Sequence, residues 1–191
     1  FHYDRLSALD AAFLDLEDGS AHMHIGSVAI FDGTPLTRAD GSFDFDQIVE
    51  YSGDTLCRNV RLRQKLVRVP GLGHPVWVDD DRFNVLYHMR HTRLPTPGGI
   101  RLLKRLAGRV MSQQLDRTRP LWEMWFVEGV EGGRFAVITK IHHCLADGIS
   151  GADILSKMMG PDADFRPQRV DRYIPRPAPG GARLLSDELM R

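Results

Sequence analysis

The chain has 191 residues, of which 42% are hydrophobic and 26% are charged, and these ordinary globular values exclude a chain that is disordered throughout. Its 25 Lys and Arg residues balance 25 Asp and Glu residues, so it lacks the basic excess that phosphate binding needs, and we expect no nucleic acid as a partner. It contains no apolar run of about 18 residues, so we expect no membrane-spanning helix.

The two cysteines and the two ends of the sequence indicate the cellular compartment of the protein and whether the chain is part of a longer one. Cys57 and Cys144 form neither a disulfide framework nor a CxxC pair, which favours a reducing cytoplasm and gives no support to structural zinc. Residues 1–9 are too short and too polar for a signal peptide. Because the chain begins at Phe1 and ends after a Pro-rich stretch, we expect it to be a piece of a longer protein.

The first part of the chain predicts a helix, a strand and a second helix. Apolar residues recur at helical spacing over 6–16, where Ser7 or Asp10 can act as the N-cap. The apolar, β-branched run at 24–31 ends at an Asp-Gly turn and predicts a strand. A second helix is expected over 45–59. Its expected buried face consists of Phe45, Ile48, Val49 and Leu56.

Residues 66–94 predict extended structure rather than a further helix. Short apolar runs at 66–69, 75–78 and 87–94 are separated by a Pro-Gly turn and by the acidic cluster at 79–81. We therefore expect three short strands here.

Residues 98–115 give the clearest helical pattern in the chain. Its expected buried positions are Ile100, Leu103, Leu106, Val110 and Leu115. Its opposite face is basic and carries Arg101, Lys104, Arg105 and Arg109. We interpret this face as a solvated surface; the alternative is a docking face for an anionic group or a membrane surface.

Two strands are predicted at 121–130 and 134–141, joined by a Glu-Gly-Gly connection in which glycine supplies the positive φ of a hairpin.

A helix is expected at 150–159. Proline and glycine are frequent beyond it, and we interpret 161–191 as a linker that follows a domain at 1–160. Helices that alternate with strands around a mixed sheet predict an α/β fold or an α+β layered sandwich.

The second of these strands leads directly into a His-His-Cys-Leu-Ala-Asp-Gly sequence. Adjacent side chains of a strand point to opposite faces, so His142 and His143 cannot both face one site. A neutral imidazole, with a reference pKa of about 6.5, can take a proton from an alcohol that attacks an acyl carbon and can return it. Asp147 can fix the turn through an Arg or orient an imidazole, and Gly148 permits a backbone approach that a Cβ would block. The pattern predicts general-base catalysis.

Other interpretations of this stretch stay open. The two histidines can be merely packed at the end of a strand. No third ligand has the spacing of a metal site, so no metal is expected. Cys144 is a conceivable nucleophile beside a histidine, although a Cys in an apolar stretch is more often an inert small hydrophobe. Ser150 lacks the G-x-S-x-G elbow of a serine nucleophile.

The stretch from His142 to Gly148 resembles the HHxxxDG signature of the CoA-dependent acyltransferase superfamily. The sequence Arg-Pro-Leu-Trp at 119–122 resembles the P-L-W element that precedes the histidine motif in bacterial wax ester synthase/diacylglycerol acyltransferases. Residues 6–13 are similar to the S-x-x-D-x-x-F start of that family. The order and spacing of the three elements are also similar, and the resemblance extends to about Met159.

This resemblance implies a chloramphenicol-acetyltransferase-like fold, an α/β layered sandwich in which a mixed sheet is flanked by helices. Members of the family consist of two similar halves with a tunnel between them, and this chain corresponds to the N-terminal half. The Pro- and Arg-rich segment after residue 160 matches the crossing between the halves. We therefore expect a C-terminal half, in the same protein or as a separate chain, to complete the active site.

The resemblance also assigns roles to residues. It makes His143 the general base, gives His142 a structural or electrostatic supporting role, and turns Asp147 away from the substrate toward a basic partner. For Trp122, packing in the core is an equal alternative to a role in the channel. The positions implied to shape the substrate channel or support the motif are Gly148, Pro120, Leu121 and Trp122.

The implied activity is the transfer of a long-chain acyl group from acyl-CoA to diacylglycerol or a fatty alcohol. Acyl-CoA is a substrate, and no cofactor is expected. The alternatives are a non-catalytic binding or assembly module of the same fold, and an acyltransferase for a polyketide or peptide-like acceptor. The expected location is the cytoplasm, and a peripheral contact with the inner face of the membrane or a lipid droplet stays open because the substrates are lipids.

Overall fold

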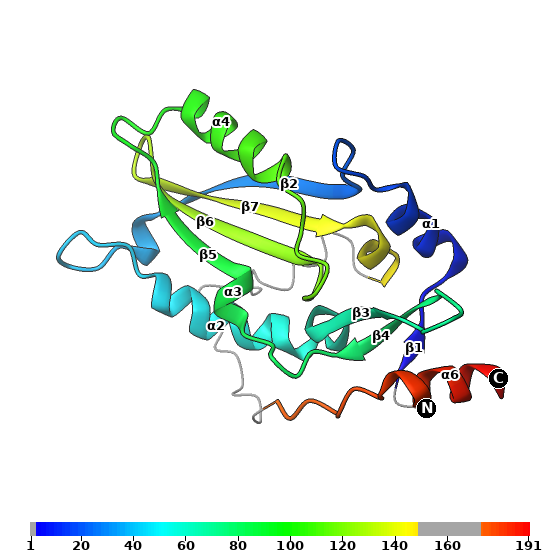
Figure 1. The fold of residues 1–191 in the computed structure, drawn as a ribbon. Coiled ribbons are helices and arrows are strands. Elements are labelled where there is room, and N and C mark those ends of the chain that lie inside the picture. Colours follow the sequence, from blue (N-terminus) through cyan, green and yellow to red (C-terminus); the bar gives the residue numbers. More distant parts are fainter. Residues whose placement is uncertain (1–2, 149–172) are drawn as a thin grey trace.

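The computed structural model describes residues 3–148 and 173–191. These residues form a large four-stranded sheet, a small three-stranded sheet and the helices that pack against them (Figure 1). The helix predicted at 150–159 lies outside the described residues. The helices and strands in chain order are β1 (Asp4–Arg5), α1 (Ala8–Leu16), β2 (His24–Asp32), η1 (Thr34–Leu36), α2 (Phe45–Arg58), η2 (Val60–Arg63), β3 (Gln64–Arg68), β4 (Pro75–Asp79), α3 (Val85–His88), β5 (Met89–Arg93), α4 (Ile100–Met111), β6 (Trp122–Val130), β7 (Arg134–His142), η3 (His143–Gly148) and α6 (Gly181–Leu189).

The large sheet has the strand order β2-β7-β6-β5. β7 pairs antiparallel with both β2 and β6, whereas β5 runs parallel to β6, so the sheet is mixed as predicted. The predicted hairpin joins β6 to β7, and Gly132 and Gly133 adopt φ values of +82° and +70° there. Glycine suits this turn because a Cβ disfavours such angles. The small sheet is antiparallel, with the order β1-β4-β3.

The two faces of the large sheet pack against different partners. Because side chains alternate along a strand, Ala136 and Ile138 of β7 pack with Leu103 and Val110 of α4 on one face. Figure 1 shows α4 lying along this face, with α2 on the other side of the sheet. The α/β architecture with a mixed sheet between helices is therefore confirmed.

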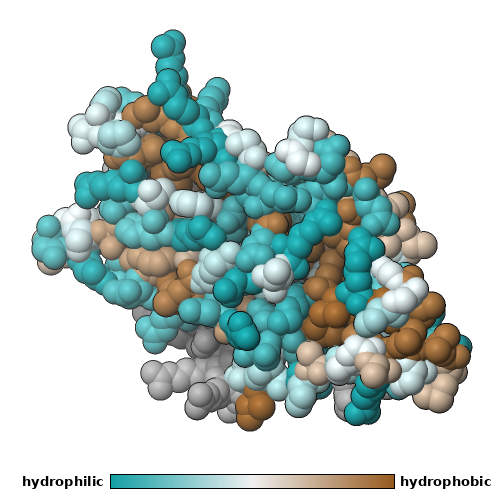
Figure 2. Space-filling model, viewed as in Figure 1, coloured by the Kyte–Doolittle hydropathy of each residue, from teal (hydrophilic) through white to brown (hydrophobic). Residues whose placement is uncertain are grey.

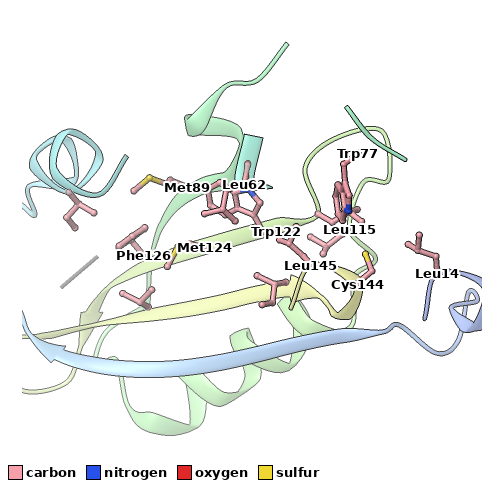
Figure 3. Packing of buried hydrophobic residues seen from close by; sticks show 14 of the residues in the cluster. Leu14, Leu62, Trp77, Met89, Leu115, Trp122, Met124, Phe126, Cys144 and Leu145 are labelled. Carbon is pink, nitrogen blue, oxygen red and sulfur yellow. Dashed lines mark hydrogen bonds between the residues drawn. The ribbon is translucent and has the colours of Figure 1, made fainter. Parts of the chain in front are cut away.

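The opposite face of the sheet supplies the main hydrophobic core. β6 contributes Trp122, Met124 and Phe126, all at most 2% exposed. Figure 3 shows Cys144 and Leu145 of η3 in the same core, near Trp122. The segment that carries the histidine motif is thus built onto the core of the fold.

Three local expectations about the middle of the chain are wrong. The third of the short strands does not extend over 87–94, because the Asn84 side chain accepts a hydrogen bond from the Leu86 N–H and begins α3, so that β5 starts only at Met89. Ile100 does not belong to the buried face of α4: it is 49% exposed, as the first residue of the helix. The helix ends at Met111, and Leu115 is buried from the loop that follows.

The expectation of an unpacked linker over 161–191 is wrong for its last part. Residues 181–189 form α6, whose Leu184 is 1% exposed and packs with Val76 of the small sheet. The buried Glu188 carboxylate accepts a hydrogen bond from the Tyr3 hydroxyl at 3.0 Å and pairs with Arg5. These contacts fasten α6 beside β1, and Figure 1 shows these two elements next to each other.

Candidate active site

His142 is the last residue of β7, and its side chain is completely buried. Its Nδ1 accepts a hydrogen bond from the Cys144 N–H at 3.1 Å, and its backbone N–H donates to the Leu121 carbonyl at 3.0 Å. With Nδ1 acting as acceptor, the neutral ring carries its proton on Nε2. The ring is a fixed part of the turn that follows the strand.

His143 begins η3 and, unlike its neighbour, is partly exposed. Its ring stacks on the ring of Phe13 in α1, with centroids 3.8 Å apart and an interplanar angle of 29°. Its backbone N–H donates to the Met23 carbonyl at 2.8 Å, and its Nδ1 is buried without a hydrogen-bond partner in the described part of the chain. The two histidines therefore lie in different environments, since His142 is enclosed and His143 reaches the surface of the chain, and the prediction that one of them faces a substrate stays a prediction.

Phe13 is placed by the helix start that was noted in the sequence. Ser7 is the N-cap of α1, because its Oγ accepts a hydrogen bond from the Asp10 N–H at 3.0 Å. The Ser7 hydroxyl also donates to the Asp10 carboxylate at 2.6 Å. Phe13 follows one turn later on the side of the helix that meets η3, so the start of the chain and the histidine motif form one site.

Sequence reasoning missed Glu17, a buried carboxylate beside His142. Its Oε2 accepts hydrogen bonds from Arg117 Nε at 2.9 Å and Gln114 Nε2 at 3.1 Å, and lies 3.5 Å from His142 Nε2. Its Oε1 lies 3.4 Å from His24 Nε2. No sequence signal separates Glu17 from an ordinary charged residue just after a helix, because its partners come from three distant segments.

Burial and charge set the protonation of this cluster. Burial raises the pKa of Glu17, but hydrogen bonds from Arg117 and Gln114 outweigh it and leave that pKa below its usual value. Burial lowers the pKa of His142 to about 4, although the Glu17 charge acts in the opposite direction. Burial and the nearby Lys140 charge lower the pKa of His24. At neutral pH the site holds a carboxylate beside neutral imidazoles.

The P-L-W element is buried in the core. Pro120, Leu121 and Trp122 are all buried, and the Trp122 indole N–H donates to the Leu62 carbonyl at 2.7 Å. His88 stacks on the Trp122 ring at 4.6 Å and donates from Nδ1 to its carbonyl at 2.8 Å. Pro120 and Trp122 also line a pocket of about 170 Å³ that neither motif histidine reaches. The packing role is thus observed, and a role in a substrate channel stays a prediction.

The other candidates in the motif have different outcomes. Asp147 and Gly148 lie in η3, and the roles assigned to them stay predictions. Burial raises the pKa of the Cys144 thiol to about 12, which favours its interpretation as an inert small hydrophobe over a nucleophile. Ser150 lies outside the described residues.

Within residues 3–148 and 173–191, no group of His, Cys, Asp and Glu side chains is arranged to hold a metal ion. The same part of the chain contains no helix that is both long and apolar enough to cross a bilayer.

A sequence model of the wax ester synthase/diacylglycerol acyltransferase catalytic domain matches residues 6–190. A probable diacylglycerol O-acyltransferase of Mycobacterium tuberculosis, tgs3, is 38% identical over 95% of this chain, which covers 65% of that protein. A putative diacylglycerol O-acyltransferase of the same organism is 40% identical over 95% of this chain, which covers 38% of it. The chain therefore spans between about one third and about two thirds of the length of these relatives.

Solved structures agree with the observed fold. The wax ester synthase/diacylglycerol acyltransferase from Marinobacter aquaeolei VT8 superimposes with a TM-score of 0.61 and 32% identity, over 78% of this chain and 36% of that one. The starter condensation domain of rhizomide synthetase RzmA gives a TM-score of 0.61 at 15% identity, over 82% of this chain and 37% of that one. The second likeness concerns the fold alone.

Proposed function

Because the chain belongs to the wax ester synthase/diacylglycerol acyltransferase family, we propose that it supplies the histidine of an acyl-CoA-dependent O-acyltransferase. The acyl donor is a long-chain acyl-CoA, and the acceptor is the hydroxyl of diacylglycerol or of a fatty alcohol. The products are triacylglycerol or a wax ester, together with free CoA. The observation that carries the proposal is the partly exposed His143 ring, held at the end of β7 by Phe13.

His143 acts as the general base. It takes the proton of the acceptor hydroxyl as that oxygen attacks the thioester carbonyl, forming a tetrahedral intermediate. The intermediate collapses, the carbon–sulfur bond breaks, and the imidazolium returns the proton to the departing CoA thiolate. The ring is neutral again after one turnover, so the step needs no further reactant.

The remaining motif residues support this base. His142, fixed by the Cys144 N–H, orients the turn, and Asp147 and Gly148 shape η3 around it. Pro120, Leu121 and Trp122 hold β6 beside β7 and bound the substrate channel from the core side. We also propose that a C-terminal half completes the site, because the relatives and the Marinobacter structure extend well beyond the matched region.

The test is an assay of thiol release from palmitoyl-CoA with the full-length protein and a panel of acceptors. Diacylglycerol and hexadecanol are expected to stimulate release of CoA and to yield the corresponding ester, seen by mass spectrometry. A matched long-chain amine and a peptide-like amine serve as controls. Transfer to the amines alone would favour the peptide-like acceptor, and no release with any acceptor would favour a non-catalytic module of the same fold.

We further propose that α4 rests against an anionic lipid surface. Arg101, Lys104, Arg105 and Arg109 are exposed, and none has an ion pair within the described residues. Figure 2 shows hydrophilic side chains projecting from the edge of the molecule where α4 lies. Beside them, Val28 and Ile30 of the edge strand β2 are 47% and 38% exposed. Cations next to exposed apolar side chains suit the surface of a bilayer with acidic headgroups, and would bring the site to lipid substrates.

Replacing Arg101 and Arg105 together by glutamine is expected to weaken binding to vesicles that contain phosphatidylglycerol. Each cation near such a surface contributes about 1 kcal/mol, so the double variant should bind about 30-fold more weakly in a sedimentation assay. Arg183→Gln, at another exposed arginine, is the matched control. Equal binding of all three proteins would refute the role of α4.

A further inference from the structure

Glu17 is a charged side chain in a place where charge is costly. Its side chain is only 1% exposed, yet hydrogen bonds from Arg117 and Gln114 keep it ionised. Its Oε1 accepts no hydrogen bond from the described residues and faces imidazoles instead. The position of this carboxylate beside two imidazoles points to an effect on those rings in addition to any contribution to the stability of α1.

The carboxylate faces the motif histidine at a defined atom. Since the Cys144 N–H occupies Nδ1 of His142, the ring proton lies on Nε2, and Nε2 is the atom 3.5 Å from Glu17 Oε2. The negative charge therefore attracts the N–H end of the ring. Together, the Cys144 N–H and Glu17 fix both the tautomer and the orientation of His142.

The same segment of the chain also holds His143. Phe13, one helical turn before Glu17, stacks on the His143 ring. Met23, which precedes β2, accepts the hydrogen bond from the His143 backbone N–H. Residues 13–23 thus contact both histidines, one through a charge and the other through a ring and a backbone carbonyl.

We propose that Glu17, anchored by Arg117, is a positioning residue that holds the orientation of His142 and, through the turn, the placement of His143. The kinetic part of this inference rests on the proposed acyltransferase function, whereas the orientation of His142 does not. Glu17 contacts no reacting atom and is not a catalytic residue.

The first test is Glu17→Gln, which keeps the size of the side chain and removes its charge. We expect kcat to fall about 10- to 100-fold while KM for palmitoyl-CoA changes by less than about a factor of two, because a residue that positions the base acts on the chemical step. Asp15→Asn is the matched control: Asp15 lies in the last turn of α1, two residues before Glu17, is 63% exposed at its side chain and pairs with Arg68 on the surface. It should retain the wild-type kcat.

The second readout is the nitrogen NMR spectrum of ¹⁵N-histidine-labelled full-length protein. We expect the Nε2–H tautomer of His142 in all three proteins, because the Cys144 N–H occupies Nδ1, and a shift of the His142 Nε2 resonance in Glu17→Gln but not in Asp15→Asn. If Glu17→Gln does not fold, Gln114→Ala, which removes one donor to Glu17, should show the same changes more weakly.

A folded Glu17→Gln protein with wild-type kcat and an unchanged His142 spectrum would overturn the assignment. Gln114→Ala without any effect would do the same if it were the only folded variant. If the wild type transfers no acyl group to any acceptor, the proposed function fails, and the spectrum alone then decides the role of Glu17.

Discussion

Replacing His143 with alanine is expected to lower kcat by about 10²- to 10⁴-fold, the usual contribution of a positioned general base. The attacking hydroxyl would then have to lose its proton to water, and the CoA thiolate would leave without a proton donor. Because His143 is only partly buried and stacks on Phe13, which is itself partly exposed, the variant should keep its fold. The measurements are thiol release from palmitoyl-CoA and the thermal unfolding temperature.

His74→Ala is the matched control, because this histidine lies in the turn between β3 and β4, where its Nε2 is 3.1 Å from the Leu6 carbonyl oxygen. It should lose no more activity than its small change in stability explains. A folded His143→Ala protein with wild-type turnover would remove His143 from the reaction. Equal losses in both variants would point to stability rather than chemistry.

Acidification from about pH 7 to about pH 5 is expected to lower the free energy of unfolding by several kcal/mol. The pKa of His142 is about 4 in the folded protein and about 6.5 in the unfolded chain, so only the unfolded chain binds this proton between those values. Unfolding is therefore favoured as the pH falls, by about 2 kcal/mol at pH 5 for His142 alone. Burial also lowers the pKa of His24 and His88, which adds in the same direction.

Urea unfolding of the protein at several pH values between 7 and 5 measures this slope. His88→Phe keeps a ring against Trp122 but cannot titrate. This variant should be less stable at every pH. Its free energy of unfolding should also depend less steeply on pH, by the equivalent of up to one bound proton. Glu17 and Asp79, whose pKa values lie below the usual range, contribute mainly at lower pH. Constant stability from pH 7 to pH 5 would contradict the burial of neutral imidazoles.

Local patterns predicted most of the fold. Two runs joined by a Glu-Gly-Gly turn placed β6 and β7, and helical spacing placed α1 and α4. The failures occurred where a single side chain or a distant contact decided the outcome. Asn84 capped a short helix inside an expected strand, and α6 formed in a Pro-rich segment because Leu184 and Glu188 found partners on the small sheet.

The candidate site was predictable only in part, for the same reason. The two histidines followed from the motif. Strand alternation predicted that their environments differ, but His143 lies in η3 and the end of β7 at His142 separates the two rings. The surroundings of His142 did not, because Glu17 and Arg117 belong to segments far apart in the sequence and become neighbours only after folding. A charged residue that ends up buried carries no local pattern that distinguishes it from a solvated one.

The fastening of α6 to β1 has a consequence for the order in which the molecule assembles. During synthesis the hairpin of β6 and β7 and its pairing with β2 can form while α6 is still inside the ribosome. Tyr3 and Arg5 obtain the carboxylate of Glu188 only after α6 has emerged. The small sheet should therefore gain its final protection from hydrogen exchange later than the large sheet, after the scaffold of the histidine turn is in place.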